Sequence, residues 1–86
     1  MKRNSERPDF YITEIYELLR AFSTEKLVEF NNKCFRHERL ISVREVLTEV
    51  EVQELRTELM SRIGEFETEE LIRIRNLGRH IQTRRT

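Results

Sequence analysis

Residues 42–64 read SVREVLTEVEVQELRTELMSRIG, and the way this stretch divides sets the number of helices in the chain. Two capping boxes occur in it, Ser42 with Glu45 and Thr48 with Glu51. In a capping box, a hydroxyl and a glutamate three residues later each accept a hydrogen bond from a backbone N–H at a helix start. Start signals only six residues apart cannot both open long helices.

The apolar residues of this stretch fall into two groups on a helical wheel turned by about 100° per residue. One group is Val43, Val46, Leu47 and Val50, and the other, on nearly the opposite side, is Val52, Leu55, Leu59 and Ile63. A straight helix cannot bury both groups against one core. The sequence therefore predicts a short helical turn near 43–47 and a separate long helix over about 49–63.

Three further helices are predicted from apolar residues at helical spacing and from capping residues. Their expected bounds are about 10–22, 24–38 and 68–82. Asp9 stands at the N-cap position of the first and Ser23 at that of the second, while Gly64 is expected to cap the C-terminus of the helix over 49–63. Gly78 falls on the apolar face of the last helix, which predicts close approach to a neighbouring helix.

Composition agrees with an all-α fold. The 86 residues include two glycines and one proline, too few turn residues for a many-stranded sheet. We expect a small bundle of four main helices, with a flexible N-terminal arm at 1–8 and a single helical domain at 9–86 that ends in a basic tail. A lone cysteine, the absence of a signal peptide and the lack of any long apolar run predict a cytoplasmic protein that does not enter a membrane.

The net charge is zero, but its distribution along the chain is uneven. Residues 1–42 are nearly neutral, residues 43–70 hold three basic and nine acidic side chains, and residues 71–86 hold five basic and no acidic ones. Two interpretations stay open. The adjacent acidic and basic blocks neutralise each other in the fold, or they form surfaces that recognise a charged partner.

Cys34 and His37 lie three residues apart, a spacing that can hold zinc. Zinc needs two more ligands, and His80 is the only other histidine. The same pair is a poor candidate for a nucleophile and its base, because a glycine-poor bundle offers little room for a pocket with an oxyanion site. We therefore expect no metal, no cofactor and no enzymatic activity.

The C-terminal helix presents a basic face and a basic tail, which indicates contact either with phosphates or with an acidic protein surface. Its basic side chains are Arg73, Arg75, Arg79 and His80, followed by Arg84 and Arg85. A helix-turn-helix with the helix over 49–63 is geometrically allowed. However, Glu65, Glu67, Glu69 and Glu70 load the N-terminal end of the basic helix and would repel DNA, and the pI of about 6.7 is low for a nucleic-acid binder.

Apolar surface exceeds what one small core needs, unless two core layers use it all. The leading expectation is a non-enzymatic regulatory or inhibitory protein that binds a larger protein through charged and aromatic helical faces. The residues expected to bind that partner are Arg73, Arg75, Arg79, His80, Arg84, Arg85, Tyr11, Tyr16 and Phe35. The alternatives are a DNA- or RNA-binding regulator that uses the same arginines and a structural homodimer.

Overall fold

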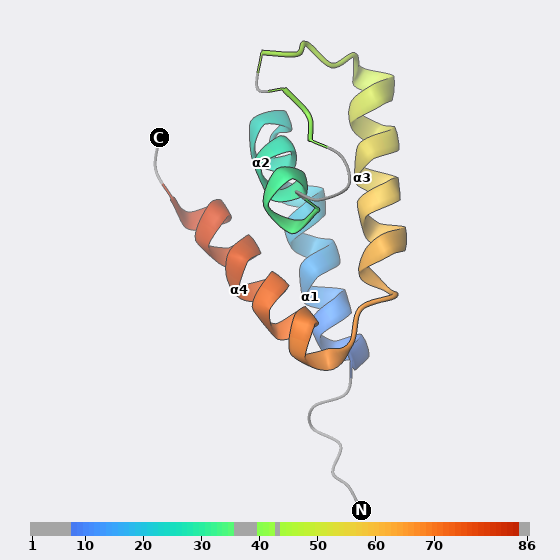
Figure 1. The fold of residues 1–86 in the computed structure, drawn as a ribbon, viewed down its shortest axis with the longest axis vertical. Coiled ribbons are helices and arrows are strands. Elements are labelled where there is room, and N and C mark those ends of the chain that lie inside the picture. Colours follow the sequence, from blue (N-terminus) through green and yellow to red (C-terminus); the bar gives the residue numbers. More distant parts are fainter. Residues whose placement is uncertain (1–7, 36–39, 43, 85–86) are drawn as a thin grey trace, which may run out of the picture.

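The computed structural model describes residues 8–35, 40–42 and 44–84, and in this part of the chain it confirms a bundle of four helices (Figure 1). The helices are α1 (Pro8–Ala21), α2 (Thr24–Cys34), α3 (Glu49–Ile63) and α4 (Thr68–Thr83). The most extensive contact joins α1 to α4, while α2 packs on α4 and α3, and α3 also packs on α1. Most of the expected N-terminal arm lies outside the described residues.

Two predicted helix boundaries are wrong. The first helix begins at Pro8, which suits the first helical position because its φ is already helical, so Asp9 lies in the first turn and not at the N-cap. The second helix ends at Cys34, and residues 36–38 of its predicted extent lie outside the described residues. It stops because Phe35 leaves the helical conformation, with φ −125° and ψ 38°, and stacks on Phe66 with ring centroids 5.9 Å apart.

Of the two capping boxes in residues 42–64, the second one forms. The backbone N–H of Glu51 donates to Thr48 Oγ1 over 3.1 Å, and the backbone N–H of Thr48 donates to Glu51 Oε1 over 2.8 Å. At the first capping box, the Glu45 N–H donates to the Ser42 carbonyl over 3.0 Å and closes a single turn. The described residues 45–48 are not helical. Val43 lies outside the described residues.

The division of the apolar residues into two faces is confirmed on α3, whereas Leu47 of the first group packs against the core with the second group. Val52 and Leu55 are 8% and 5% exposed, whereas Val50 is 67% exposed. One core fills the space between the helices, and its most deeply buried side chains, each at most 1% exposed, are Ile15, Leu19, Leu27, Phe30, Leu59, Ile63, Leu71 and Ile81. Within the described ranges, the length and hydropathy of the helices do not suit any of them to spanning a membrane.

Both predicted glycine roles can be compared with the structure. Gly64 occupies the C-cap of α3 as predicted, but its φ of −65° and ψ of −13° are right-handed helical values that other residues adopt readily. Gly78 is buried where α4 crosses α1, and a Cβ built there would lie 2.9 Å from Leu18 Cδ1. The predicted close approach of α4 to a neighbouring helix is therefore confirmed.

Long basic side chains cover the C-terminal ends of two helices, where backbone carbonyls have no partner within the helix. Arg56 of α3 donates to the carbonyls of Leu19 and Phe22 at the end of α1, each over 2.9 Å. Lys26 of α2 donates to the carbonyl of Gln82 near the end of α4 over 3.0 Å. These contacts join helices that are distant in sequence, and they place positive charge at the negative ends of the helix dipoles.

Candidate protein-binding surfaces

Arg75 and Arg79 of α4, and Arg84 just after it, are paired with acids of α1 and α2. Arg79 Nε donates to Glu14 Oε2 over 2.6 Å, and Arg75 Nη1 lies 3.8 Å from Glu14 Oε1. Arg84 pairs with Glu29 of α2. Burial raises the pKa of Glu29, but hydrogen bonds from Arg84 and Lys33 and the positive charges of both outweigh it, so the pKa lies below its usual value.

The three aromatic side chains expected to contact a partner belong to the core or its edge, which corrects the expectation that they are exposed. Tyr11 is 9% exposed and lies under the Arg75 guanidinium, 5.0 Å from its carbon to the ring centroid. Phe35 is 5% exposed, because it closes the end of the core. Tyr16 is half-buried, and its hydroxyl donates to the carbonyl of Met60 over 2.9 Å, which ties α1 to α3.

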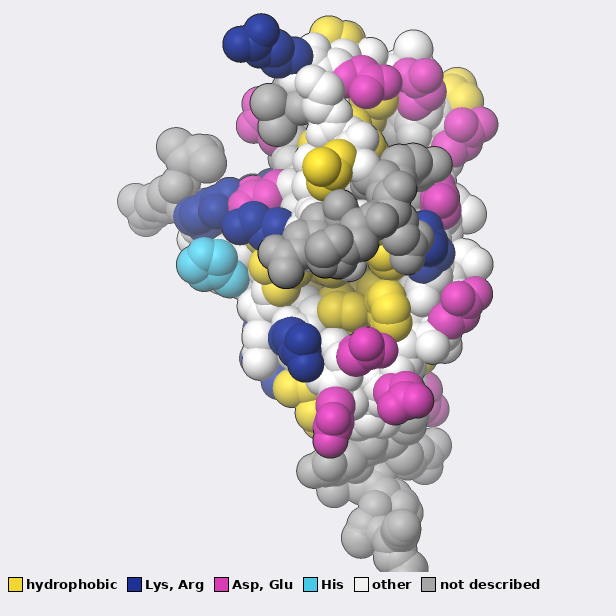
Figure 2. All heavy atoms as spheres, viewed as in Figure 1, with side chains coloured by type: hydrophobic (Ala, Val, Ile, Leu, Met, Phe, Trp, Pro, Cys, Tyr) yellow, Lys and Arg dark blue, Asp and Glu magenta, His cyan; other side chains and the backbone are white. Residues whose placement is uncertain are grey.

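Two members of the predicted basic face, Arg73 and His80, are exposed on α4, and neither forms an ion pair with another described residue. Figure 2 shows basic side chains and the cyan histidine together at the edge where α4 ends. Arg85 lies outside the described residues. The basic face that stays available to a partner is therefore smaller than the sequence predicts.

Of the predicted pair of Cys34 and His37, His37 lies outside the described residues. Burial raises the pKa of the Cys34 thiol to about 12, which keeps it protonated and weakly nucleophilic at neutral pH. In the part of the chain that the structure describes, no three His, Cys, Asp or Glu side chains gather closely enough to hold a metal ion.

A second surface lies at the end of the molecule where the connection after α2 meets the start of α3. Its apolar side chains are Leu40, Val46 and Val50, which are 65%, 90% and 67% exposed. Figure 2 shows hydrophobic side chains in yellow among acidic ones in magenta at this upper end. We call it the acidic-apolar surface and define it by six exposed residues, Leu40, Glu45, Val46, Glu49, Val50 and Glu54.

The carboxylates of the acidic-apolar surface are not neutralised by the fold. Within the ranges 8–35, 40–42 and 44–84, Glu45, Glu49 and Glu54 form no ion pair. The sequence left open whether the acidic block at 43–70 pairs with the basic block at 71–86. In the structure the described basic residues of 71–86 that form ion pairs do so with Glu14 and Glu29, which leaves these carboxylates of the acidic block in solvent.

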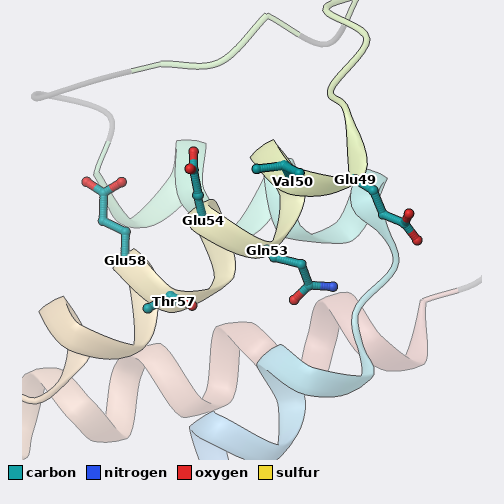
Figure 3. A pocket seen from close by; sticks show the side chains of 6 residues that line it. All are labelled: Glu49, Val50, Gln53, Glu54, Thr57 and Glu58. Carbon is teal, nitrogen blue, oxygen red and sulfur yellow. The ribbon is translucent and has the colours of Figure 1, made fainter.

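The surface is hollowed on two sides of one row of side chains. Figure 3 shows Val50, Glu54 and Glu58 pointing to the same side of α3, away from Gln53. A groove of about 340 Å³ lies between Glu54 and Glu58 of this row and the connection before α3, with Leu40 and Leu47 among its apolar lining. A shallow hollow on the outer side of the row includes Val50 and Gln53. The row is therefore accessible from both flanks.

The position of the connection between α2 and α3 depends on hydrogen bonds made by Asn32 of α2. The sequence did not predict these bonds. The Asn32 side chain accepts from the Ile41 N–H over 2.8 Å and donates to the Ile41 carbonyl over 2.9 Å. The buried Asn31 supports it by donating to Asn32 Oδ1 over 3.1 Å. Two adjacent asparagines inside a predicted helix are the only signal in the sequence, since asparagine often bonds to nearby backbone.

Replacing Asn32 by alanine is expected to lower the free energy of unfolding by about 1–3 kcal/mol, because both backbone groups of Ile41 lose their partner. Asn76→Ala is the matched control, since this exposed α4 asparagine gains the same helix propensity and forms a bond only to Arg75. Urea denaturation measures both. Equal stability of the two variants would show that the Asn32 bonds do not hold the segment in place.

Comparison with models of protein families, with curated proteins and with solved structures finds no match to this chain.

Proposed function

We propose that this chain is a small non-enzymatic protein that regulates a larger protein by binding it. The observation that carries the proposal is the exposure of three large apolar side chains, Leu40 and Val46 on the connection after α2 and Val50 in the first turn of α3, on a molecule whose four helices already share one closed core. Single exposed apolar residues are ordinary, but neighbouring ones rimmed by charges are typical of interaction sites. Burying an exposed apolar side chain of this size in a complex contributes about 1.5–3 kcal/mol.

The long connection that carries Leu40 and Val46 supports the same proposal. Fourteen residues separate the end of α2 at Cys34 from the start of α3 at Glu49. Connections of about this length in a small domain are usually functional, because a shorter one would join the same helices at a lower entropic cost. The Asn32 bonds to Ile41 hold the part of this connection next to Leu40 against α2.

The basic face contributes less to this proposal than the sequence analysis expects. Arg75, Arg79 and Arg84 each hold an acid of α1 or α2, so reversing their charges would disturb the bundle as well as any partner contact. Arg73 and His80 remain exposed for a secondary contact. Nucleic-acid binding by the same arginines has weaker support for the same reason, since phosphates would compete with Glu14 and Glu29.

The proposal is tested by affinity capture from the lysate of the source cell, after nuclease treatment, with three tagged baits. These are the unmodified chain, Val46→Ser combined with Val50→Ser, and the matched control Phe10→Ser, which removes an apolar side chain that is 61% exposed elsewhere. A partner of the acidic-apolar surface should be recovered by the first and third baits and reduced at least about tenfold on the second.

Circular dichroism of the three baits checks that helicity is equal. The same proteins in the same amounts on all three baits would contradict the proposal. If the unmodified chain instead shows a melting temperature that rises with its own concentration, and the serine variant does not, the homodimer alternative replaces it.

A further inference from the structure

We infer that the acidic-apolar surface receives a basic amphipathic helix of the partner, an inference that rests on the proposed function. The sign of the charge is the first reason. Residues 43–70 hold nine acidic and three basic side chains, and two of those basic groups are directed into the fold. Arg56 caps the end of α1, and Arg62 lies over the Phe35 ring, 4.7 Å from its centroid. The exposed carboxylates therefore attract a partner rich in lysine or arginine.

The shape of the surface favours a helix over an extended segment. Val50, Glu54 and Glu58 form an i, i+4, i+8 row along α3, with a hollow on each flank (Figure 3). Rows of this kind pack into the grooves of a second helix. The backbone of α3 is bonded within its own helix, so it offers no free edge to which a strand could add.

The length of α3 sets the length of the occupant. Its 15 residues extend over about 22 Å at 1.5 Å per residue, which a partner helix of three to four turns would cover. Such a helix would place apolar residues on Val46, Val50 and the groove beside Leu40. Its basic residues would then lie near Glu45, Glu49 and Glu54, which border these apolar side chains.

A second copy of this chain suits the surface less well than a foreign helix. The basic helix of the copy would be α4, whose Arg75 and Arg79 already hold Glu14 of their own chain. Docking through these arginines would break pairs that the fold has made. A partner helix with free lysines or arginines has no such cost.

Three synthetic 16-residue peptides with a fluorescent label serve as probes. The first places leucine at i, i+3, i+4 and i+7 spacing with lysine elsewhere, the second scrambles the same residues so that no apolar stripe forms, and the third replaces lysine by glutamate. Fluorescence anisotropy with the full chain should give an affinity at least about tenfold higher for the first peptide than for the second, and no binding for the third.

Two double variants locate the binding. Glu45→Lys with Glu54→Lys reverses the charge on the acidic-apolar surface, and Glu17→Lys with Glu65→Lys makes the same change in net charge at exposed positions outside it. The first should weaken binding of the leucine–lysine peptide at least about tenfold, and the second should change it less than about threefold. Amide chemical shifts should move within residues 44–58.

Three results would overturn the inference: equal binding of the scrambled peptide, equal losses in the two double variants, or amide shifts confined to α4. Its failure can be told apart from that of the proposed function. A cellular partner lost on Val46→Ser with Val50→Ser, together with no peptide binding, would keep the function and replace the basic helix by another occupant. Specific peptide binding without a cellular partner would support the preference of the surface for a basic helix. It would contradict the proposed function.

Discussion

Replacing Gly78 by leucine is expected to lower the free energy of unfolding by about 3 kcal/mol, the upper part of the usual cost of overpacking a core. The reason is the crossing of α4 over α1. A Cβ at Gly78 alone would lie 2.9 Å from Leu18 Cδ1 and 3.6 Å from Phe30 Cε1, and leucine adds three further carbons. A domain of this length has a total stability of about 4–13 kcal/mol, so the change removes a large share of it.

Thermal and urea denaturation followed by circular dichroism measure this effect. Gly64→Leu is the matched control, because a Cβ there would meet no atom closer than the Ser61 carbonyl oxygen at 3.6 Å, and the backbone conformation is right-handed helical. We expect the control to change stability by less than about 1 kcal/mol. A Gly78→Leu variant as stable as the Gly64→Leu variant would show that the two helices separate easily at this crossing.

Replacing Phe30 by alanine is expected to lower the free energy of unfolding by about 3–5 kcal/mol, the range for removing a buried aromatic ring. Phe30 is fully buried on α2, and its ring lies 5.7 Å from that of Phe22, between centroids. It also contacts the position of Gly78 on α4. Its loss leaves a cavity where α2, α4 and the end of α1 meet, so we expect a substantial unfolded fraction at physiological temperature.

Phe10→Ala provides the comparison, because this phenylalanine is 61% exposed and makes an edge contact with Tyr11. Its substitution should cost less than about 1 kcal/mol. Equilibrium denaturation of both variants gives the difference directly. If the two phenylalanines prove equivalent, Phe30 does not hold the helices together and the packing of α2 described above is wrong.

The surface proposed to bind a partner has a consequence for salt dependence. The carboxylates Glu45, Glu49 and Glu54 are exposed, so their attraction for a basic partner is screened within about 8 Å at physiological ionic strength. Contacts of Val46 and Val50 are not screened in this way. Added salt should therefore slow association more than it speeds dissociation, because charges act mainly on the encounter.

Helix type and number could be read from local patterns, because caps and apolar spacing act within one or two turns. Thr48 and Glu51 satisfy each other's backbone donors whatever the rest of the chain does, and Ser23 accepts from Lys26 in the same way. The two apolar faces in residues 42–64 were also visible, and with them the exposed position of Val50. Two of the six residues of the acidic-apolar surface, Val46 and Val50, thus belonged to one predicted apolar face.

Contacts between residues distant in the sequence set the end of the second helix, the position of the segment after it and the ion pairs. The second helix ends early because Phe35 meets Phe66, and the segment after it is placed by the bonds between Asn32 and Ile41. Arg79 finds Glu14 at a separation of 65 residues. The packing of the helices, and not closeness in the sequence, decides which acidic and basic side chains form ion pairs. Glu45, Glu49 and Glu54 of the acidic block stay open to solvent because the arginines of α4 lie beside acids of α1 and α2 and not beside these three.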